Sequence, residues 1–353
     1  MNNIFEKASR HFHKQLPFVL YAKPNSTNLR GFFQQNNNLN LVKDYTEKGF
    51  VFADFEGNQS ILIPESECEI LNATFDFINK SVGSDNFSSS LDGKKEFENL
   101  VEKGVKAIES GVFEKVVLSR KETFENNDFD FLKVFEKMLF SYSNAFRYCW
   151  FHPQIGMWMG ASPEQLLNVE NAKFKTVSLA GTQNFQANSE VIWQKKEQDE
   201  QQFVTDFIIS SLKSEVDSIT ITTPSTFQAG NVLHLKTDIK GVFKANFNLK
   251  KIVSVLHPTP AVCGLPKENA KQFILENEGY ERKFYSGFLG ELNWNIKLSK
   301  NEDSDLFVNL RCMEIEQHKV HLYVGCGITK DSNPEKEYVE TANKAMTMKQ
   351  ILK

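Results

Sequence analysis

The sequence has few cysteines, and none of them stands in the spacing that a metal or disulfide motif requires. There are five in 353 residues, an odd number, and no two form a C-x-x-C pair. Structural zinc sites and disulfide frameworks both use closely and regularly spaced cysteines, so the spacing argues against both. We expect a protein of a reducing compartment, the cytoplasm. The cysteines are Cys68, Cys149, Cys263, Cys312 and Cys326.

The chain also lacks an excess of one sign of charge and lacks long apolar runs. Its 41 Lys and Arg residues against 45 Asp and Glu give a net charge of −4, without the basic excess that nucleic-acid binding needs. No window approaches the roughly 20 apolar residues of a membrane span, and the first residues do not resemble a signal peptide. We predict neither nucleic acid nor a membrane as a partner.

Several short catalytic motifs are absent as well. There is no P-loop, no G-x-S-x-G and no H-E-x-x-H. His234 and His257 lack the spacing of a metal site, and from spacing alone each is interpreted as a core or loop histidine.

Hydrophobic residues make up 41% of the chain, which is enough for a large core. Long period-two runs mixed with a few helical patterns, without regular strand–helix alternation, predict an α+β fold with large antiparallel sheets. We expect helices over 97–111, 192–215, 268–276 and 334–352. We expect strands over 113–124, 147–153, 156–162, 173–182, 218–225, 234–243, 305–316 and 318–329.

The N-terminal region has short apolar runs at 16–22 and 49–55 that predict strands separated by polar turns. The polar, Gly- and Ser-rich segment 81–96 is the one plausible subdomain boundary. We place residues 1–92 as extra strands beside a core of residues 97–353, within a single domain of residues 1–353.

The stretch HPTPAVCGLPK, residues 257–267, interrupts apolar residues with prolines and a glycine. Proline fixes φ and removes a backbone donor, and Gly264 permits angles that other residues avoid. The stretch therefore predicts a shaped loop and excludes a central strand or a helix interior.

Two predicted helices carry carboxylates on faces where a charge needs a partner. Glu200 precedes Phe203 and Val204 of an apolar stripe, and Glu337 and Glu340 lie three residues apart on a face shared with Lys344. Carboxylates brought together in this way suit Mg²⁺. The alternatives are a first-turn glutamate favoured by the helix dipole and a solvated charged face.

Two further residues are candidates for proton transfer, and two glycines for anion binding. Lys115 lies on a strand face where desolvation would free its amine to act as a base, and Glu164 follows a proline at a strand end, as a general acid would. A solvent-directed lysine and a capping glutamate are the alternatives. Gly325 and Gly327 precede a helix start and would let backbone N–H groups approach a carboxylate or phosphate.

Taken in order, a series of motifs resembles the chorismate-utilising enzymes, and most closely the isochorismate synthases. The resemblance covers roughly residues 97–353. The motifs are KVVLSR, GASPEQLL, SLAGT, EQDEQQFVTDFI, HLKTDIKG, HPTPAVCGLPKENA, ERKFYSGFLGE, VNLRC and YVGCGITKDSNPEKEYVETANKA.

The resemblance implies two antiparallel sheets packed face to face, with helices outside, and a cleft that binds chorismate and Mg²⁺. Glu200 and Glu340 would bind the metal directly, with Glu337 close by and acting through water. Arg311 and Tyr285 would hold the enolpyruvyl carboxylate. The implied substrate-binding residues are Gly181, Thr182, His234, Ala261, Tyr285, Arg311, Gly325, Gly327 and Lys344.

The resemblance also implies the chemistry. Lys115 would activate water for attack at C2 of chorismate, and Glu164 would protonate the leaving C4 hydroxyl, giving isochorismate. Ala261 favours this outcome over the alternative, a salicylate synthase that goes on to eliminate pyruvate. Lys115 and Ala180 disfavour the relatives that add ammonia, so we expect no amidotransferase subunit. We also expect a monomer. Gln201 is a departure, since many relatives have histidine there.

Overall fold

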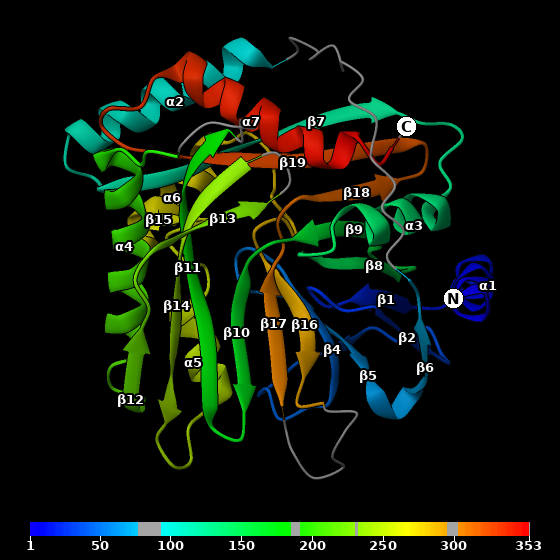
Figure 1. Ribbon diagram of the computed structural model, residues 1–353. Coiled ribbons are helices and arrows are strands. Elements are labelled where there is room, and N and C mark those ends of the chain that lie inside the picture. Colours follow the sequence, from blue (N-terminus) through cyan, green and yellow to red (C-terminus); the bar gives the residue numbers. More distant parts are fainter. Residues whose placement is uncertain (77–92, 185–190, 230–231, 295–302, 353) are drawn as a thin grey trace.

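Two large antiparallel sheets form the protein, and helices cover their outer faces (Figure 1). The computed structural model describes the whole chain except residues 77–92, 185–190, 230–231, 295–302 and 353. In Figure 1 the strands of one sheet run across the view and those of the other run down it. The α+β architecture expected from the sequence is confirmed.

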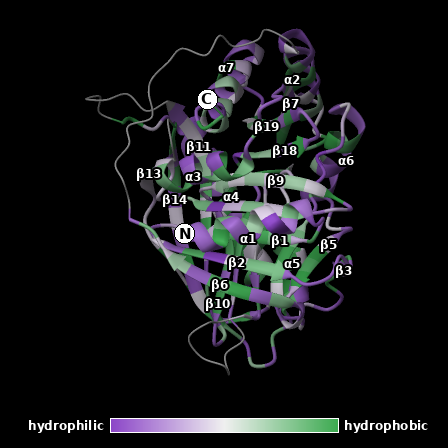
Figure 2. Cartoon of the chain, turned by 90° about the vertical axis from the view of Figure 1, so that its right-hand side faces the viewer, coloured by the Kyte–Doolittle hydropathy of each residue, from purple (hydrophilic) through white to green (hydrophobic). Residues whose placement is uncertain are grey.

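Within the described residues the first sheet has nine strands. Figure 2 shows several of them one above another, from β7 down to β6. Its order is β15 (Gly264–Leu265), β7 (Lys115–Glu125), β19 (Lys319–Ile328), β18 (Cys312–Glu316), β9 (Gly156–Ser162), β8 (Phe146–His152), β1 (Phe18–Ala22), β2 (Asn28–Gln34) and β6 (Cys68–Thr74).

The second sheet has ten strands, one of which, β13 (Ser225–Ala229), pairs with β14 beside the main path. The path is β12 (Val216–Ile221), β14 (Val232–Phe243), β11 (Lys173–Asn184), β10 (Gln165–Glu170), β17 (Ser304–Val308), β16 (Phe288–Leu292), β4 (Gly49–Ala53), β5 (Ser60–Pro64) and β3 (Asn40–Leu41).

Seven α-helices lie within the described residues, with one short 3-10 turn at Glu65–Glu67. In Figure 1, α2 and α7 lie along the top, α4 at the left, and α1 and α3 at the right. None of the described helices is long and apolar enough to span a membrane. The helices are α1 (Asn2–His13), α2 (Lys94–Glu109), α3 (Phe131–Ser141), α4 (Lys195–Leu212), α5 (Leu249–Leu256), α6 (Lys267–Asn277) and α7 (Pro334–Lys349).

Alternating side chains of the central strands enter two different cores, because both faces of these strands are covered. In β1, Leu20 points to the core beneath α1 and α3, whereas Tyr21 points between the sheets. In β4, Phe52 enters the same inter-sheet core and Val51 the core beneath α4 and α5. This double burial explains why the apolar runs of the sequence are continuous.

Aromatic rings dominate the core between the sheets. Phe52 stacks on Phe284 with ring centroids 4.4 Å apart, and Phe146 of the first sheet stacks on Phe307 of the second at 4.3 Å. Offset stacking adds to the burial of large apolar area. The contact between Phe146 and Phe307 joins the two sheets directly.

Most expected elements are confirmed, but the structure also has elements that were not predicted. The strands that were not predicted are β2, β3, β5, β6, β10, β13, β15 and β16. The helices expected over 97–111, 192–215, 268–276 and 334–352 correspond to α2, α4, α6 and α7, whereas α1, α3 and α5 were not predicted. The strand expected over 305–316 is wrong as a single element. It is divided into β17 and β18, which belong to different sheets.

The N-terminal strands join both sheets. Strands β1, β2 and β6 extend the first sheet, and β3, β4 and β5 extend the second. Most of the segment interpreted as a subdomain boundary, 81–96, lies outside the described residues.

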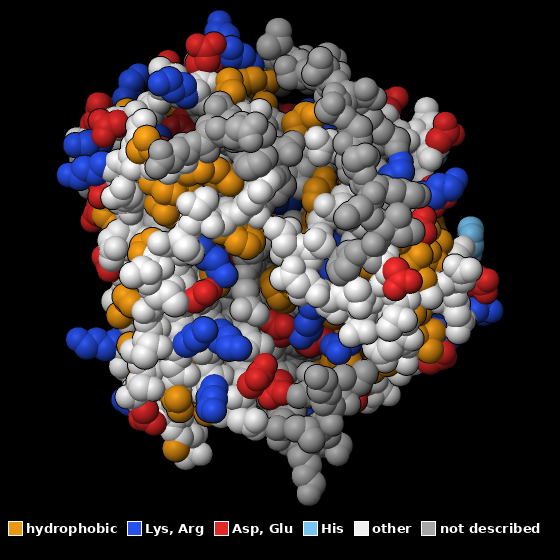
Figure 3. Space-filling model, viewed as in Figure 1, with side chains coloured by type: hydrophobic (Ala, Val, Ile, Leu, Met, Phe, Trp, Pro, Cys, Tyr) orange, Lys and Arg blue, Asp and Glu red, His pale blue; other side chains and the backbone are white. Residues whose placement is uncertain are grey.

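The surface carries both signs of charge. In Figure 3 acidic and basic side chains are interspersed over the face drawn, which is hollowed near its centre. This distribution agrees with the nearly balanced composition.

Truncation of an inter-sheet ring tests this core. Phe52 is fully buried, so Phe52→Ala should lower the free energy of unfolding by about 3–5 kcal/mol, through lost burial and a cavity. The control is Leu275→Ala, at a position 51% exposed, where the change should stay within about 0.5 kcal/mol. Urea denaturation measures both, and equal effects of the two variants would contradict the assignment.

Candidate active site

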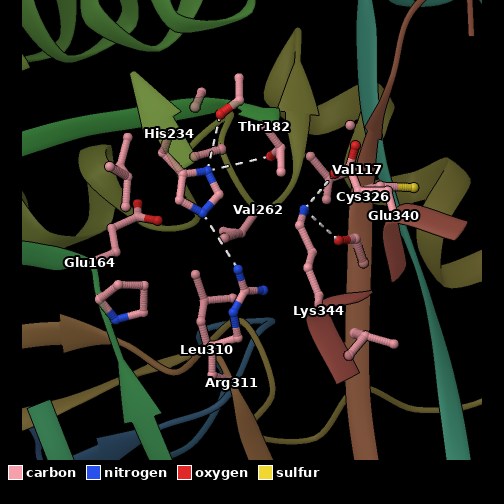
Figure 4. A pocket seen from close by; sticks show the side chains of 18 of the residues that line it. Val117, Glu164, Thr182, His234, Val262, Leu310, Arg311, Cys326, Glu340 and Lys344 are labelled. Atoms are coloured by element: carbon pink, nitrogen blue, oxygen red, sulfur yellow. Dashed lines mark hydrogen bonds and ion pairs between the residues drawn. The ribbon is translucent and has the colours of Figure 1, made fainter. Parts of the chain in front are cut away.

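The candidate site is a pocket where both sheets meet helices α4 and α7. Its walls come from β7 and β19 of the first sheet, β11 and β14 of the second, and the loop before β15. Figure 4 shows Glu164 and Lys344 on opposite sides, with Arg311 and His234 between them. Its charged or titratable lining residues are Lys115, Glu164, Glu200, His234, Tyr285, Arg311, Tyr323, Cys326, Glu340 and Lys344.

Lys115, the first residue of β7, is 2% exposed and points into this pocket. Its Nζ lies 4.0 Å from Oε2 of Glu200. Burial lowers the pKa of Lys115, because the charged ammonium loses its hydration; Glu200 opposes this shift and Lys344 adds to it. The structure therefore favours a neutral amine more than a surface lysine would, as a base requires.

Glu164 lies between β9 and β10 and is 3% exposed. Burial raises the pKa of Glu164 to about 8, although the positive charges of Lys115 and Arg311 oppose the shift. Its backbone is held at both ends: the N–H donates to Oγ of Ser162 at 3.3 Å, and the carbonyl accepts from Val308 N–H at 3.0 Å. A fixed carboxyl group that keeps its proton near neutral pH can act as a general acid.

The three glutamates of the predicted metal site come from α4 and α7, and each faces a lysine. Glu340 pairs with Lys344 at 2.6 Å, and Glu337 pairs with Lys196 at 3.0 Å. Glu200 and Glu340 line the pocket, whereas Glu337 is buried behind its wall. The sequence analysis missed Lys196, whose only signal was its place one helical turn before Glu200.

The electrostatics of this cluster fit a divalent cation. Burial raises the pKa of Glu200, and repulsion from Glu340 and Glu337 adds to the rise. Carboxylate oxygens are the hard donors that suit Mg²⁺. Among the described residues, however, no group of three or more His, Cys, Asp or Glu side chains lies close enough together to hold a metal ion. Lysines balance the charges instead.

The opposite part of the pocket presents donors to an anion. Arg311 Nε is buried and has no hydrogen-bond partner among the described residues. Arg311 follows the crossing from β17 to β18 and has φ of 49°, a left-handed conformation that non-glycine residues seldom adopt. The crossing aims its guanidinium into the pocket (Figure 4).

His234 orients this arginine. Its Nδ1 lies 3.0 Å from the carbonyl of Gly181 and 3.3 Å from Oγ1 of Thr182, and its Nε2 lies 3.4 Å from Nη2 of Arg311. Since arginine can only donate, Nε2 accepts and Nδ1 carries the proton. Burial lowers the pKa of His234 to about 3, with help from Arg311, so the ring is neutral.

The glycines of the pocket are explained by close approach. A Cβ at Gly325 would lie 2.9 Å from the Tyr285 hydroxyl, and one at Gly327 would lie 3.0 Å from Cε of Lys115. At Gly181, with φ of +72°, a Cβ would lie 2.8 Å from the Glu197 carbonyl oxygen in the first turn of α4. Side chains at these positions would therefore clash with neighbouring atoms of the site or of α4.

The shaped loop predicted at 257–267 is confirmed as one pocket wall. Ala261 and Val262 line the pocket, and Gly264, with φ of +146°, pairs with Val116 of β7. A Cβ at Gly264 would lie 2.3 Å from the Lys115 carbonyl oxygen, so only glycine brings the loop this close to β7.

Gln201 points away from the pocket and anchors α4 to the second sheet. Its Nε2 donates to Oγ1 of Thr237 at 2.7 Å and to Oγ1 of Thr205 at 2.9 Å. Gln201, which stands where many relatives have histidine, therefore contributes to the packing of α4 against the second sheet. It removes no residue from the pocket.

Every predicted site residue except Glu337 lines this one pocket, and Glu337 lies beside it. The sequence analysis did not single out the apolar part of the lining, because apolar residues at these positions look like ordinary core. These residues are Val117, Pro163, Leu179, Val262, Leu310 and Val324.

Residues 65–353 match the family model described as chorismate binding enzyme. The chain therefore belongs to the chorismate-binding enzymes, an assignment that agrees with the two-sheet fold.

The curated relatives include isochorismate synthases. The chain is 28% identical to the salicylate biosynthesis isochorismate synthase of Pseudomonas aeruginosa, over 75% of this chain and 56% of that protein. It is 27% identical to the isochorismate synthase MenF of Haemophilus influenzae, over 89% of this chain and 81% of that protein. The chain thus spans little more than half the length of the first of these relatives.

Solved structures share the fold. A Bacillus anthracis protein described as a 2,3-dihydroxybenzoate-specific isochorismate synthase, DhbC, superposes with a TM-score of 0.81 at 22% identity, covering 98% of this chain and 99% of that one. Anthranilate synthase component I from Streptococcus pneumoniae has a TM-score of 0.65 at 18% identity, covering 94% and 89%.

The buried carboxyl group gives a prediction about stability and pH. In the unfolded chain Glu164 loses its proton near the ordinary pKa of 4.5. In the folded chain its pKa is about 8, so the carboxyl group stays protonated to a higher pH. The wild-type protein therefore loses stability as pH rises through this window, whereas Glu164→Gln does not titrate there. Thermal denaturation should show that the stability of Glu164→Gln relative to wild type grows from pH 4.5 to about 8 and then levels off.

Glu170→Gln, at an exposed position, controls for the loss of one negative charge. A constant difference between Glu164→Gln and wild type across this pH range would show that Glu164 is ionised in the folded protein.

Proposed function

We propose that this chain is an isochorismate synthase, which converts chorismate to isochorismate reversibly and without a redox step. The observation that carries the proposal is the pairing of a buried lysine of lowered pKa with a buried glutamic acid of raised pKa in one pocket. Opposite shifts of this kind assign a base and an acid at neutral pH. Curated relatives named as isochorismate synthases support the same reaction.

In the proposed reaction Lys115 Nζ takes a proton from water as the oxygen bonds to C2 of chorismate. The ring double bond shifts, the bond from C4 to its hydroxyl breaks, and Glu164 supplies the proton with which that group leaves as water. One water enters and one leaves, so the product has the composition of the substrate.

The rest of the pocket would hold the substrate's two carboxylates. Arg311, with its unpartnered Nε, would bind the enolpyruvyl carboxylate together with the Tyr285 hydroxyl and the backbone beside Gly325 and Gly327. Neutral His234 would keep the guanidinium aimed at it, and Lys344 would balance charge.

Mg²⁺ is the proposed cofactor, held by Glu200 and Glu340 with Glu337 nearby. When bound, it would neutralise these carboxylates and attract the ring carboxylate of chorismate. The mutual repulsion of the three glutamates supports this assignment.

The finer features of the function are part of the proposal. Ala261 in the pocket wall favours release of isochorismate over pyruvate elimination, and the product would enter menaquinone or catechol siderophore synthesis. We propose a cytoplasmic monomer that uses water and needs no amidotransferase subunit.

Product analysis tests the reaction. The purified chain is incubated with chorismate, with and without Mg²⁺, and products are separated chromatographically because isochorismate and chorismate have the same mass. We expect an isochorismate peak that requires Mg²⁺ and stops growing at an equilibrium mixture. Lys115→Ala should form none while still binding chorismate, since it lacks the base. Salicylate with pyruvate would favour the salicylate synthase alternative, and no conversion by the wild type would contradict the proposal.

Glu340→Gln tests the metal site. Loss of a carboxylate ligand should raise the Mg²⁺ concentration for half-maximal activity by roughly tenfold or more, and should reduce the thermal stabilisation that Mg²⁺ gives without substrate. Glu335→Gln, on the same helix with a side chain 72% exposed, is the control and should leave both titrations unchanged. An unaltered Mg²⁺ titration for Glu340→Gln would remove Glu340 from the site.

A further inference from the structure

Strand β7, which carries Lys115, has on its outer side a short partner strand, β15, among the described residues. β15 pairs with β7 through two residues. One further backbone bond follows, from Val117 N–H to the Cys263 carbonyl at 2.7 Å. On that side of β7 the loop then diverges, and its residues Ala261 and Val262 form the pocket wall.

A pair of side chains occupies the place where a longer strand would continue. Arg282 Nη2 donates to the Val117 carbonyl at 2.7 Å, and Glu278 Oε1 accepts from Ser119 N–H at 2.7 Å. Residues two apart on a strand present their N–H and C=O groups to the same side, so these are the groups that a neighbouring strand would pair. The Glu278–Arg282 pair satisfies them instead.

The same arginine reaches across to the loop. Its Nη1 donates to the Val262 carbonyl at 2.9 Å, while Nε and Nη2 donate to the two carboxylate oxygens of Glu278 at 2.7 and 2.5 Å. The guanidinium also packs over Phe55, 4.5 Å from the ring centroid, and lies 5.7 Å from that of Tyr285. Both side chains of the pair are buried: Arg282 is 2% exposed and Glu278 is 1% exposed.

We propose that Glu278 and Arg282 are a positioning pair for the reaction, which sets the separation between β7 and the loop wall that contains Ala261. The inference rests on the proposed function for its consequence in turnover. Arg282 bonds to the carbonyls of Val117 and Val262. Lys115, the proposed base, lies two residues before Val117, and Ala261 lies directly before Val262. The arginine therefore connects the strand that carries the base to the loop that forms the pocket wall.

The chemistry of the guanidinium explains why an arginine serves here. Its planar fork donates in several fixed directions at once, whereas an ammonium is a point charge that cannot bridge two carbonyls and a carboxylate in one plane. A longer β15 would satisfy the same backbone groups but would draw the loop against β7 and fill the pocket. The Glu278–Arg282 pair bonds to the free N–H and C=O groups of β7 and keeps β7 and the loop apart.

The test is Arg282→Lys, which keeps the buried charge and removes the fork. Arg30→Lys is the matched control, because Arg30 forms a 2.5 Å ion pair with buried Glu291 away from the pocket. Both variants should lose thermal stability. Only Arg282→Lys should lower kcat, by about tenfold to a hundredfold with a smaller change in KM, because displacement of the base by a fraction of an ångström is costly.

Hydrogen exchange provides a readout that does not depend on turnover. Backbone amides of residues 259–266 should exchange faster in Arg282→Lys than in wild type and in Arg30→Lys. Unchanged exchange there, or a kcat within twofold of the control, would overturn the positioning role. A wild-type chain that leaves chorismate unconverted would contradict the proposed function, and the exchange measurement would still decide whether the pair holds the loop.

Discussion

The pocket depends on one constraint, which is that charges of both signs are buried together and must balance. Lys115, Glu164 and Glu200 are each less than one tenth exposed, and an isolated charge in such a place would be too costly to keep. The protein meets the constraint in two ways. Near α4 and α7 it pairs carboxylates with lysines, and at Glu164 it keeps the proton on the carboxyl group.

This balance is also what prepares the site for chemistry. The desolvation that lowers the pKa of Lys115 raises that of Glu164, so one environment shifts the two pKa values in the directions that the proposed base and acid require. The neutral ring of His234 lets an arginine lie beside it without repulsion. If the proposed function is correct, chorismate and Mg²⁺ would replace these internal ion pairs on binding.

Much of the fold and the site could be predicted from the sequence, and the misses have physical reasons. Helical spacing placed Glu337 and Glu340 on one face, and the run of motifs brought Lys115 and Glu164 into one site. The run at 305–316 resembles a single strand because apolar residues recur through both halves, although the backbone turns at Arg311 and divides it into β17 and β18. The contacts of Lys196 and Arg282 could not be predicted, since they join segments by side-chain geometry that no periodicity encodes.

The order of strands has a consequence for how the chain is made. β7 pairs with β19 and β4 pairs with β16, so strands that begin at Lys115 and Gly49 wait for partners more than 200 residues further along. Pairings of such high contact order close late in folding. On the ribosome Lys115 and Glu164 are therefore synthesised before Glu340 and Lys344 of α7, which line the same pocket. The pocket is assembled only after α7 has emerged, and a product truncated before α7 would lack that wall.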